Sequence, residues 1–254
     1  MGGFWTFLRK EFREIFKTWR IWVLPGIVLF FALSGPPLAK LTPELIKTLT
    51  TQQPGLIIQL PEPTYMDAYL EWISNLSQIV LFAAIIIFGG MISGEKKSGT
   101  ATLVLTKPLS RTSFVLAKFI SNLVLLVVTV ALGTAVTWGV TLATFGDAPL
   151  QQLLVSTGLF LLLGILFLGV MTLFSSMVDS QAGAAGLGIL VMVVLSLLAM
   201  WGPALDYSPA GMMSASLSYL ADKEPLLLWP SLTAVATALL ALAGGAFAFN
   251  RREL

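Results

Sequence analysis

The chain alternates between long apolar runs and short polar segments. Uncharged runs occupy residues 21–39, 72–94, 119–146, 148–178, 180–205 and 225–250. Each run is long enough for a bilayer-spanning helix, which needs about 20 apolar residues, and is too long and too apolar for a membrane strand. The pattern predicts an all-α integral membrane protein that forms one transmembrane domain over residues 1–254. Its six spans are expected at about 21–39, 70–93, 113–143, 152–178, 182–202 and 228–249.

The residues before the first span have the pattern of an amphipathic helix over 4–19. Its apolar arc holds Phe4, Phe7, Leu8, Phe12, Ile15 and Trp19, and the opposite arc holds Arg9, Lys10, Arg13, Glu14 and Lys17. Such a helix lies in the headgroup plane with its cations toward anionic lipid. Glu11 falls inside the apolar arc. We expect its carboxylate to reach water or to pair with an arginine at helical spacing. A contact with a soluble partner or with the 94–111 loop is the alternative.

Proline and glycine mark the ends of the spans. Pro36-Pro37 is expected to end the first span, and the outer segment 41–70 to be extended or turn-rich, with a short helix near 43–50. A second outer segment, 203–227, contains an apolar piece from Gly211 to Leu220. This piece is too short to cross a bilayer, so it should lie at the interface or dip partway into the membrane.

The distribution of Lys and Arg sets the predicted orientation. With the N-terminus inside, the inner segments hold twelve of the 15 basic residues and the outer segments hold three. This asymmetry follows the positive-inside rule and places both termini in the cytoplasm. The first twenty residues are too charged for a cleavable signal peptide. The sequence therefore predicts a multi-pass protein of the plasma or inner membrane.

Composition excludes several kinds of chemistry. The chain is 56% hydrophobic and 11% charged, and it contains no Cys and no His; its mean hydropathy is +0.87. Disulfides, thiolate metal sites and histidine bases or ligands are therefore absent. No glycine-rich phosphate loop of the GxxxxGK[ST] type occurs. We expect no catalytic residue, no metal site and no cofactor bound by this chain.

The basic segment 94–111 lies between the second and third apolar runs. Ser98 can cap a short helix over about 99–106, and Lys107-Pro108 ends it, because the residue before proline disfavours the helical region. Ser110 is placed to cap the third span. The positive-inside rule accounts for the charges of this segment but not for its apolar stretch, Leu103-Val104-Leu105. These three residues need a partner surface or the lipid interface.

Polar and small residues inside the spans suggest packing first. Asn75, Gln78, Asn122 and Thr137 are expected to hydrogen-bond between helices, and the alternative is that they line a pathway for an amphipathic substrate. The lack of charges at the midplane argues against a proton-coupled transporter. Small residues spaced by four let helices approach closely, and in a six-span protein they more often pack the monomer. A dimer seam at Gly183 and Gly186 is the alternative use of one such stripe.

One stretch of the chain resembles a known family. It runs Ile92-Ser93-Gly94-Glu95-Lys96-Lys97-Ser98-Gly99-Thr100, continues with Leu103, Leu105 and Lys107-Pro108-Leu109-Ser110-Arg111, and ends with Ala117-Lys118-Phe119. This stretch resembles the permease subunit of type 2 (ABC-2) ABC transporters. Ala117 departs from the pattern, in which glycine is more usual. The N-terminal amphipathic helix, the six spans and the irregular outer stretch before the last span are also similar.

The resemblance implies a prokaryotic, homodimeric export permease. Two copies of the chain would pair, each binding one separate ATPase subunit that carries ATP and Mg²⁺. Segment 94–111 would be the coupling helix, and the amphipathic helix would be the elbow helix beside it. The implied coupling residues are Gly94, Glu95, Lys96, Lys97, Gly99, Thr100, Leu103, Lys107, Pro108 and Arg111. The implied partner-contact residues of the elbow helix are Arg9, Lys10, Glu11 and Glu14.

Two other functions remain open at this point. The first is an ATPase-dependent complex that moves lipid, regulates signalling or supports metal-centre assembly rather than simply exporting a solute. The second is a structural or receptor-like membrane protein with no ATPase. Membrane lipid is an expected partner in every case, nucleic acid is not, and the transported substrate cannot be read from the residues.

Overall fold

The computed structural model describes residues 2–50, 62–106, 109–221 and 227–251, and every regular element among them is a helix. In chain order, the elements are α1 (Gly2–Lys17), α2 (Arg20–Thr50), α3 (Tyr65–Asn75), the π-helix η1 (Leu76–Val80), α4 (Leu81–Lys97), α5 (Thr100–Leu105), α6 (Arg111–Phe145), α7 (Leu150–Met177), α8 (Gln181–Leu198), α9 (Gly202–Tyr207), the 3₁₀-helix η2 (Pro209–Gly211), α10 (Met212–Leu220) and α11 (Leu228–Arg251).

Six of these helices or helix runs are long and apolar enough to cross a membrane. They are α2, the continuous run from α3 to α4, α6, α7, α8 and α11. The predicted all-α fold with six spans is therefore confirmed. The amphipathic pattern over 4–19 corresponds to α1, and the short helix expected over 99–106 corresponds to α5.

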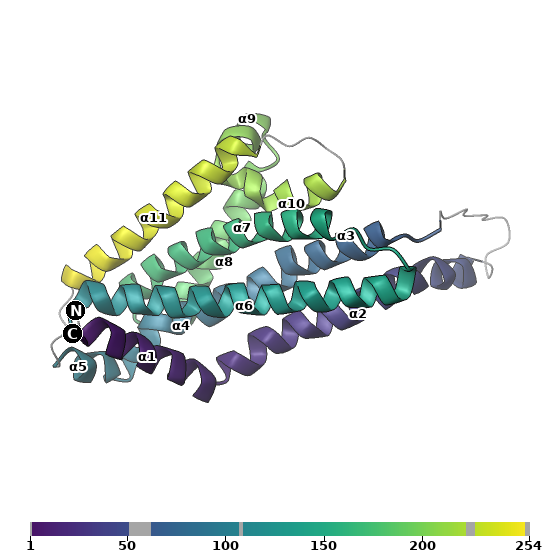
Figure 1. The fold of residues 1–254 in the computed structure, drawn as a ribbon. Helices are drawn as coiled ribbons and strands as arrows, with labels where there is room; N and C mark the ends of the chain where they lie inside the picture. The colour runs from purple at the N-terminus through teal and green to yellow at the C-terminus, as the bar shows by residue number, and fades with distance from the viewer. Residues whose placement is uncertain (1, 51–61, 107–108, 222–226, 252–254) are drawn as a thin grey trace.

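Helix α7 lies at the centre of the bundle, and α11 runs along it (Figure 1). Glycines make this approach close: a Cβ on Gly169 would lie 2.7 Å from the carbonyl oxygen of Ala238, and one on Gly245 would lie 3.1 Å from that of Thr172. Helix α8 packs on α4 and α7 but leaves most of its surface exposed. Its outward face is apolar, as expected for a helix in contact with lipid.

The prediction that the first span ends at Pro36-Pro37 is wrong. Helix α2 continues through both prolines and Pro43 to Thr50. Each proline removes an N–H donor, but its fixed φ is compatible with a helix, and α2 is held past the prolines by packing on α3 and α6. The far end of α2 is also held in place, because Lys40 Nζ donates to the Thr144 carbonyl of α6 at 2.8 Å.

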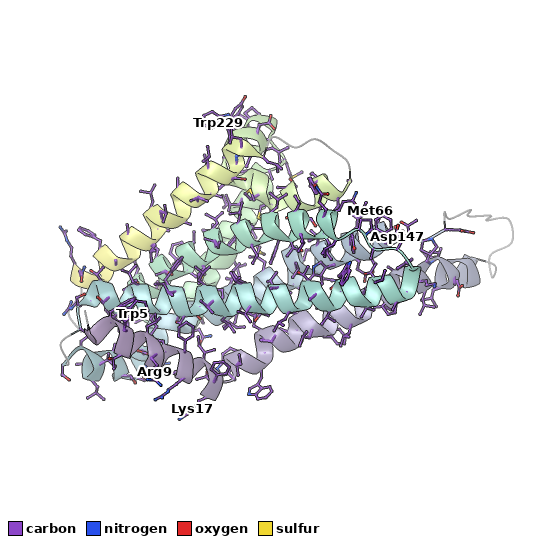
Figure 2. The ribbon with its side chains drawn as sticks, in the orientation of Figure 1. Trp5, Arg9, Lys17, Met66, Asp147 and Trp229 are labelled. Carbon is purple, nitrogen blue, oxygen red and sulfur yellow. The ribbon has the colours of Figure 1, made fainter. Side chains whose placement is uncertain are left out.

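The two ends of the bundle differ. The start of α1, the helix α5, the start of α6 and the end of α11 lie together at one end (Figure 1). Arg111 Nη1 donates to the carbonyl of Asn250 at 3.0 Å, which joins the third and last spans there. Met66 and Asp147 lie near the opposite end (Figure 2). The end that carries α5 is therefore the one at which the sequence places most of its basic residues.

The described part of the segment before the last span, residues 202–221, is helical rather than irregular. It folds into α9, η2 and α10, and α10 packs on α7. Met212, Ala215 and Leu220 of α10 are buried. The expected interfacial or partly inserted piece is thus a nine-residue helix that covers the bundle.

Candidate functional site

Helix α1 packs against α6 instead of contacting lipid alone. Phe7 of α1 stacks on Phe114 of α6 with ring centroids 5.2 Å apart, and Phe114 stacks in turn on Phe249 of α11 at 5.1 Å. Phe7, Leu8 and Ile15 are buried, whereas Trp5, Phe16 and Trp19 are exposed. Figure 2 shows Arg9 and Lys17 on the side of α1 that faces away from the helical bundle. The apolar arc is therefore divided between the protein core and the surrounding lipid.

This packing corrects the expectation for Glu11. Its carboxylate neither reaches water nor pairs with an arginine: the residue is 4% exposed, and its Oε2 lies 2.8 Å from Nζ of Lys118 in α6. Oε1 accepts a hydrogen bond from Lys10 at 3.1 Å. The physical reason is that Glu11 lies on the face of α1 that contacts α6, where a buried carboxylate requires a cation.

Lys10, Glu11, Glu14, Glu95 and Lys118 form one ionic cluster at the junction of α1, α4 and α6. Lys118, itself 2% exposed, contacts both Glu11 and Glu95. Lys10 contacts Glu14 and lies 3.4 Å from Glu95. The two lysines thus join the elbow-like helix α1 to the end of α4, immediately before the segment that carries α5.

The charges of this cluster nearly balance. Carboxylate oxygens of Glu11, Glu14 and Glu95 lie within 4.8 Å of one another, a spacing that a metal ion could use. Here the ammonium groups of Lys10 and Lys118 supply the positive charge. Burial lowers the pKa of Lys10, but the hydrogen bond to Glu14 and the charges of Glu11 and Glu95 outweigh it and hold that pKa above its ordinary value of 10.5. Lys10 is therefore charged at physiological pH.

Segment 94–111 makes a sharp turn at Gly99. This glycine has φ of 72°, a left-handed conformation that costs other residues energy, and it is the N-cap position of α5. The expectation that Ser98 caps this helix is wrong by one residue, because Ser98 ends α4 and its hydroxyl donates to the Glu95 carbonyl at 3.2 Å. Ser110 caps α6 as predicted, accepting from the Ser113 N–H at 3.1 Å.

Only part of the apolar stretch 103–105 is strongly exposed. Leu103 is 70% exposed, whereas Val104 and Leu105 are partly buried against the core and Ala101 is fully buried. Leu103 therefore projects from a helix whose other side is anchored. The sequence predicted that Leu103, Val104 and Leu105 all need a partner surface, whereas in the structure only Leu103 is left strongly exposed.

The other residues predicted to couple the chain to an ATPase differ in their contacts and exposure. Lys96 Nζ lies 2.9 Å from Asp179 and donates to the Ser176 carbonyl, which ties the end of α4 to the α7–α8 turn. Gly94 and Lys97 are exposed and Thr100 is partly buried. Lys107 and Pro108 lie outside the described residues.

The four proposed pathway residues do not share one site. Gln78 is exposed on η1 and donates to Ser74 at 2.8 Å, and Asn75 ends α3. Asn122 and Thr137 are both buried on α6. Fifteen residues of α-helix separate them, so they lie about 22 Å apart along the axis. Asn122 lies one turn from Lys118 and hydrogen-bonds its carbonyl at 2.8 Å.

The small-residue stripe of α8 divides between two faces. Ala184 and Gly188 face inward, where a Cβ on Gly188 would meet Met171 and Ile85. Gly186 is exposed, and a Cβ there would meet no described atom within 4 Å. Gly183 lies against Val178 and Ser180 of the preceding turn. A dimer seam on the Gly186 face stays a prediction.

Sequence reasoning included Lys118 in the family-like stretch but did not identify it as the centre of a site. A usable signal was present. One carboxylate, Glu11, lay in an apolar arc, and one lysine, Lys118, lay inside the expected third span, 113–143. Two opposite charges on apolar faces of different helices are expected to meet, because each is costly to bury alone.

Comparison with known proteins agrees with this architecture. A family model described as ABC-2 family transporter protein matches residues 5–254, nearly the whole chain. A relative, the uncharacterized transmembrane protein YxlG of Bacillus subtilis (strain 168), is 24% identical over 189 residues, which cover 73% of each chain.

Proposed function

Because the chain belongs to the ABC-2 transporter family, we propose that it works as a homodimer coupled to two copies of a separate ATPase and exports its substrate. Family membership makes the chain a membrane permease component of an ABC transporter and implies an ATPase partner in general. ATP and Mg²⁺ would be bound by that partner, and both termini would lie in the cytoplasm with α5.

One observation carries the coupling proposal: an exposed Leu103 on a short helix whose base is a buried ionic cluster. An apolar side chain that enters a pocket of a partner is a typical centre of a binding interface. Force applied to α5 would reach α4 directly, because only Ser98 and Gly99 lie between the two helices. From α4 it would pass to α1 and α6 through Glu95, Lys10 and Lys118. Such a connected unit could move between two arrangements under the control of a soluble motor.

Stimulation of ATP hydrolysis tests this role. The chain would be reconstituted in lipid vesicles with its ATPase partner, and hydrolysis would be measured against ATPase concentration. Leu103→Ser should weaken the apparent affinity about tenfold or more, as expected for a central apolar contact. Thr106→Ser is the matched control, because the exposed Thr106 is the C-cap residue of the same helix and serine keeps the hydroxyl that donates to the Leu103 carbonyl.

Parent-like stimulation by Leu103→Ser would contradict the assignment of α5. Glu95→Ala and Lys107→Ala extend the test to the remaining coupling residues. If both variants couple as well as the parent, the role assigned to segment 94–111 is wrong.

The runner-up function is an ATPase-dependent complex that moves lipid, regulates signalling or supports metal-centre assembly. It predicts ATP hydrolysis without vectorial movement of a solute. A transport assay in sealed vesicles separates the two functions, because an exporter accumulates substrate on one side only when ATP is supplied to the other.

A further inference from the structure

A groove of about 230 Å³ lies where α1 and the start of α2 meet α6, and its lining is largely apolar. Helix α1 contributes Phe12 and Phe16, α2 contributes Pro25, and α6 contributes Val128 and Leu132 among others. Phe16, Val128 and Leu132 are 69%, 50% and 56% exposed. The groove is therefore open along the outer side of the bundle, where the third span contacts lipid.

The length and direction of the groove match one leaflet of a bilayer. Helix α6 lines it from Ser121 to Leu132, which is about 16 Å of helix. Because α6 starts at the end of the bundle that carries α5 (Figure 1), the groove runs from that end toward the interior of the membrane. The hydrocarbon core of a bilayer is about 30 Å thick, so one leaflet contributes about 15 Å. An acyl chain of that leaflet can therefore lie along the whole groove.

Helix α1 carries a line of cations beside this groove. Arg9, Arg13 and Lys17 follow one another at four-residue spacing, and all three are exposed. Figure 2 shows Arg9 and Lys17 directed away from the bundle. Arg9 lies three residues before Phe12, and Arg13 lies three residues before Phe16, so both arginines are helical neighbours of groove residues. Among the described residues, none of the three cations is paired with a carboxylate.

The carboxylates of α1 are directed to a different side of the helix. Glu11 is buried against Lys118, and both Glu11 and Glu14 contact Lys10. Their negative charge is therefore met by lysines of the ionic cluster and not by the outward cations. A phosphate group suits two neighbouring arginines, because a guanidinium can donate two parallel hydrogen bonds to phosphate oxygens. Basic side chains at a membrane surface also favour anionic over zwitterionic lipid.

We propose that α1 and α6 bind one anionic phospholipid, with its phosphate at Arg9 and Arg13 and one acyl chain along the groove. The phosphate supplies a partner for the outward cations of α1, and the chain covers the exposed apolar residues of α6. The general attraction of an amphipathic helix to anionic lipid needs neither the groove nor particular arginines, whereas this site needs both. The lipid comes from the leaflet at the α5 end of the bundle, and its binding does not rest on the proposed export function.

Photolabelling tests the site on the full chain alone. The chain in phosphatidylcholine nanodiscs would be labelled with phosphatidylglycerol that carries a diazirine in one acyl chain, and the matched probe is phosphatidylcholine with the same chain. Mass spectrometry of the peptides should find saturable labelling of residues 12–25 and 121–132 by the phosphatidylglycerol probe only, and unlabelled phosphatidylglycerol should compete.

Variants of the cations test recognition of the headgroup. Arg9→Gln and Arg13→Gln should each weaken the apparent affinity for the phosphatidylglycerol probe about fivefold, and the double variant about 25-fold. Arg251→Gln is the matched control and should leave labelling unchanged, because Arg251 is an exposed arginine at the same end of the bundle whose guanidinium lies over the Phe247 ring, away from the groove lining. Helical circular dichroism would verify that each variant is folded.

A second pair of variants tests the groove. Val128→Trp fills it and should abolish saturable labelling. Leu190→Trp, a comparable change at an exposed apolar position of α8, should leave labelling unchanged. Glycerol phosphate, an anionic headgroup without acyl chains, should not compete with the probe at equal concentration.

Three results would overturn the proposal. Equal saturable labelling by the phosphatidylcholine probe, or parent-like affinity of the double arginine variant, would mean that the groove holds surrounding lipid without recognition of its charge. Undiminished labelling of Val128→Trp, or competition by glycerol phosphate, would mean that the acyl chain does not occupy the groove. Labelling spread over all lipid-facing helices would mean that no specific site exists. Failure of ATPase coupling with intact labelling would contradict the proposed function and leave the lipid site standing.

Discussion

Replacing Lys118 with methionine should destabilise the protein far more than removing an exposed ion pair. Lys118 is 2% exposed and contacts two carboxylates whose side chains are 5% and 10% exposed. Removing one partner of a buried ion pair costs about 3–5 kcal/mol, because the remaining charge is left buried and uncompensated. Lys10 stays within 3.1 Å of Glu11 and 3.4 Å of Glu95. We therefore expect the lower end, about 3 kcal/mol.

The free energy of unfolding can be measured in mixed micelles of dodecyl maltoside and increasing dodecyl sulfate, with helical circular dichroism as the signal. Glu95→Gln in the Lys118→Met background removes one orphaned charge and should recover part of the loss, so the double variant should be more stable than Lys118→Met. A loss below about 1 kcal/mol, the range of an exposed pair, or simple additivity of the two changes, would refute a buried cluster that holds α1, α4 and α6 together.

Three further predictions use the same unfolding measurement. Gly99→Ala should cost about 1–2 kcal/mol, because alanine disfavours the left-handed conformation; Gly94→Ala, in the helical end of α4 with no described atom near its Cβ position, should be neutral or stabilising. Gly169→Ala should cost about 1–3 kcal/mol by forcing α7 from α11, and Gly158→Ala on the same helix, where the Cβ position is open, should not. Lys10→Met should remove a contribution that is constant from about pH 7 to pH 10 and declines only above its ordinary pKa of 10.5, because a raised lysine pKa stabilises the folded state below that value.

The fold was predictable because its main signals are local and strong. Apolar run length alone predicted six spans, and Ser110 capped α6 as expected from its place before a helical pattern. The segment around Ser98 was predicted to within one residue. Its error arose because glycine at a left-handed position, rather than the neighbouring hydroxyl, occupies the N-cap.

The remaining errors depended on contacts between distant residues. Pro36-Pro37 is a stop signal in water, but α2 continues in contact with α3 and α6. Glu11 looked like an isolated exception because its partner is Lys118, 107 positions away in the chain. A polar cavity lined by Glu11 of α1 and Asn122 of α6 was missed for the same reason, since the two residues come from different helices. Residue spacing along one helix contains no information about contacts between residues of different helices.

Because of the π-helical turn at Leu76–Val80, the number of residues in the second span does not by itself determine which faces of α3 and α4 pack on the bundle. A π-turn takes in one residue more than an α-turn, so the outer and inner halves of the span are offset by about 100° from the continuation of a single α-helix. A relative could therefore lose one residue here, with an α-turn in place of the π-turn, and still present the same faces in α3 and α4. When sequences of this family are aligned, a one-residue gap belongs within 76–80, inside a membrane span, rather than in a loop.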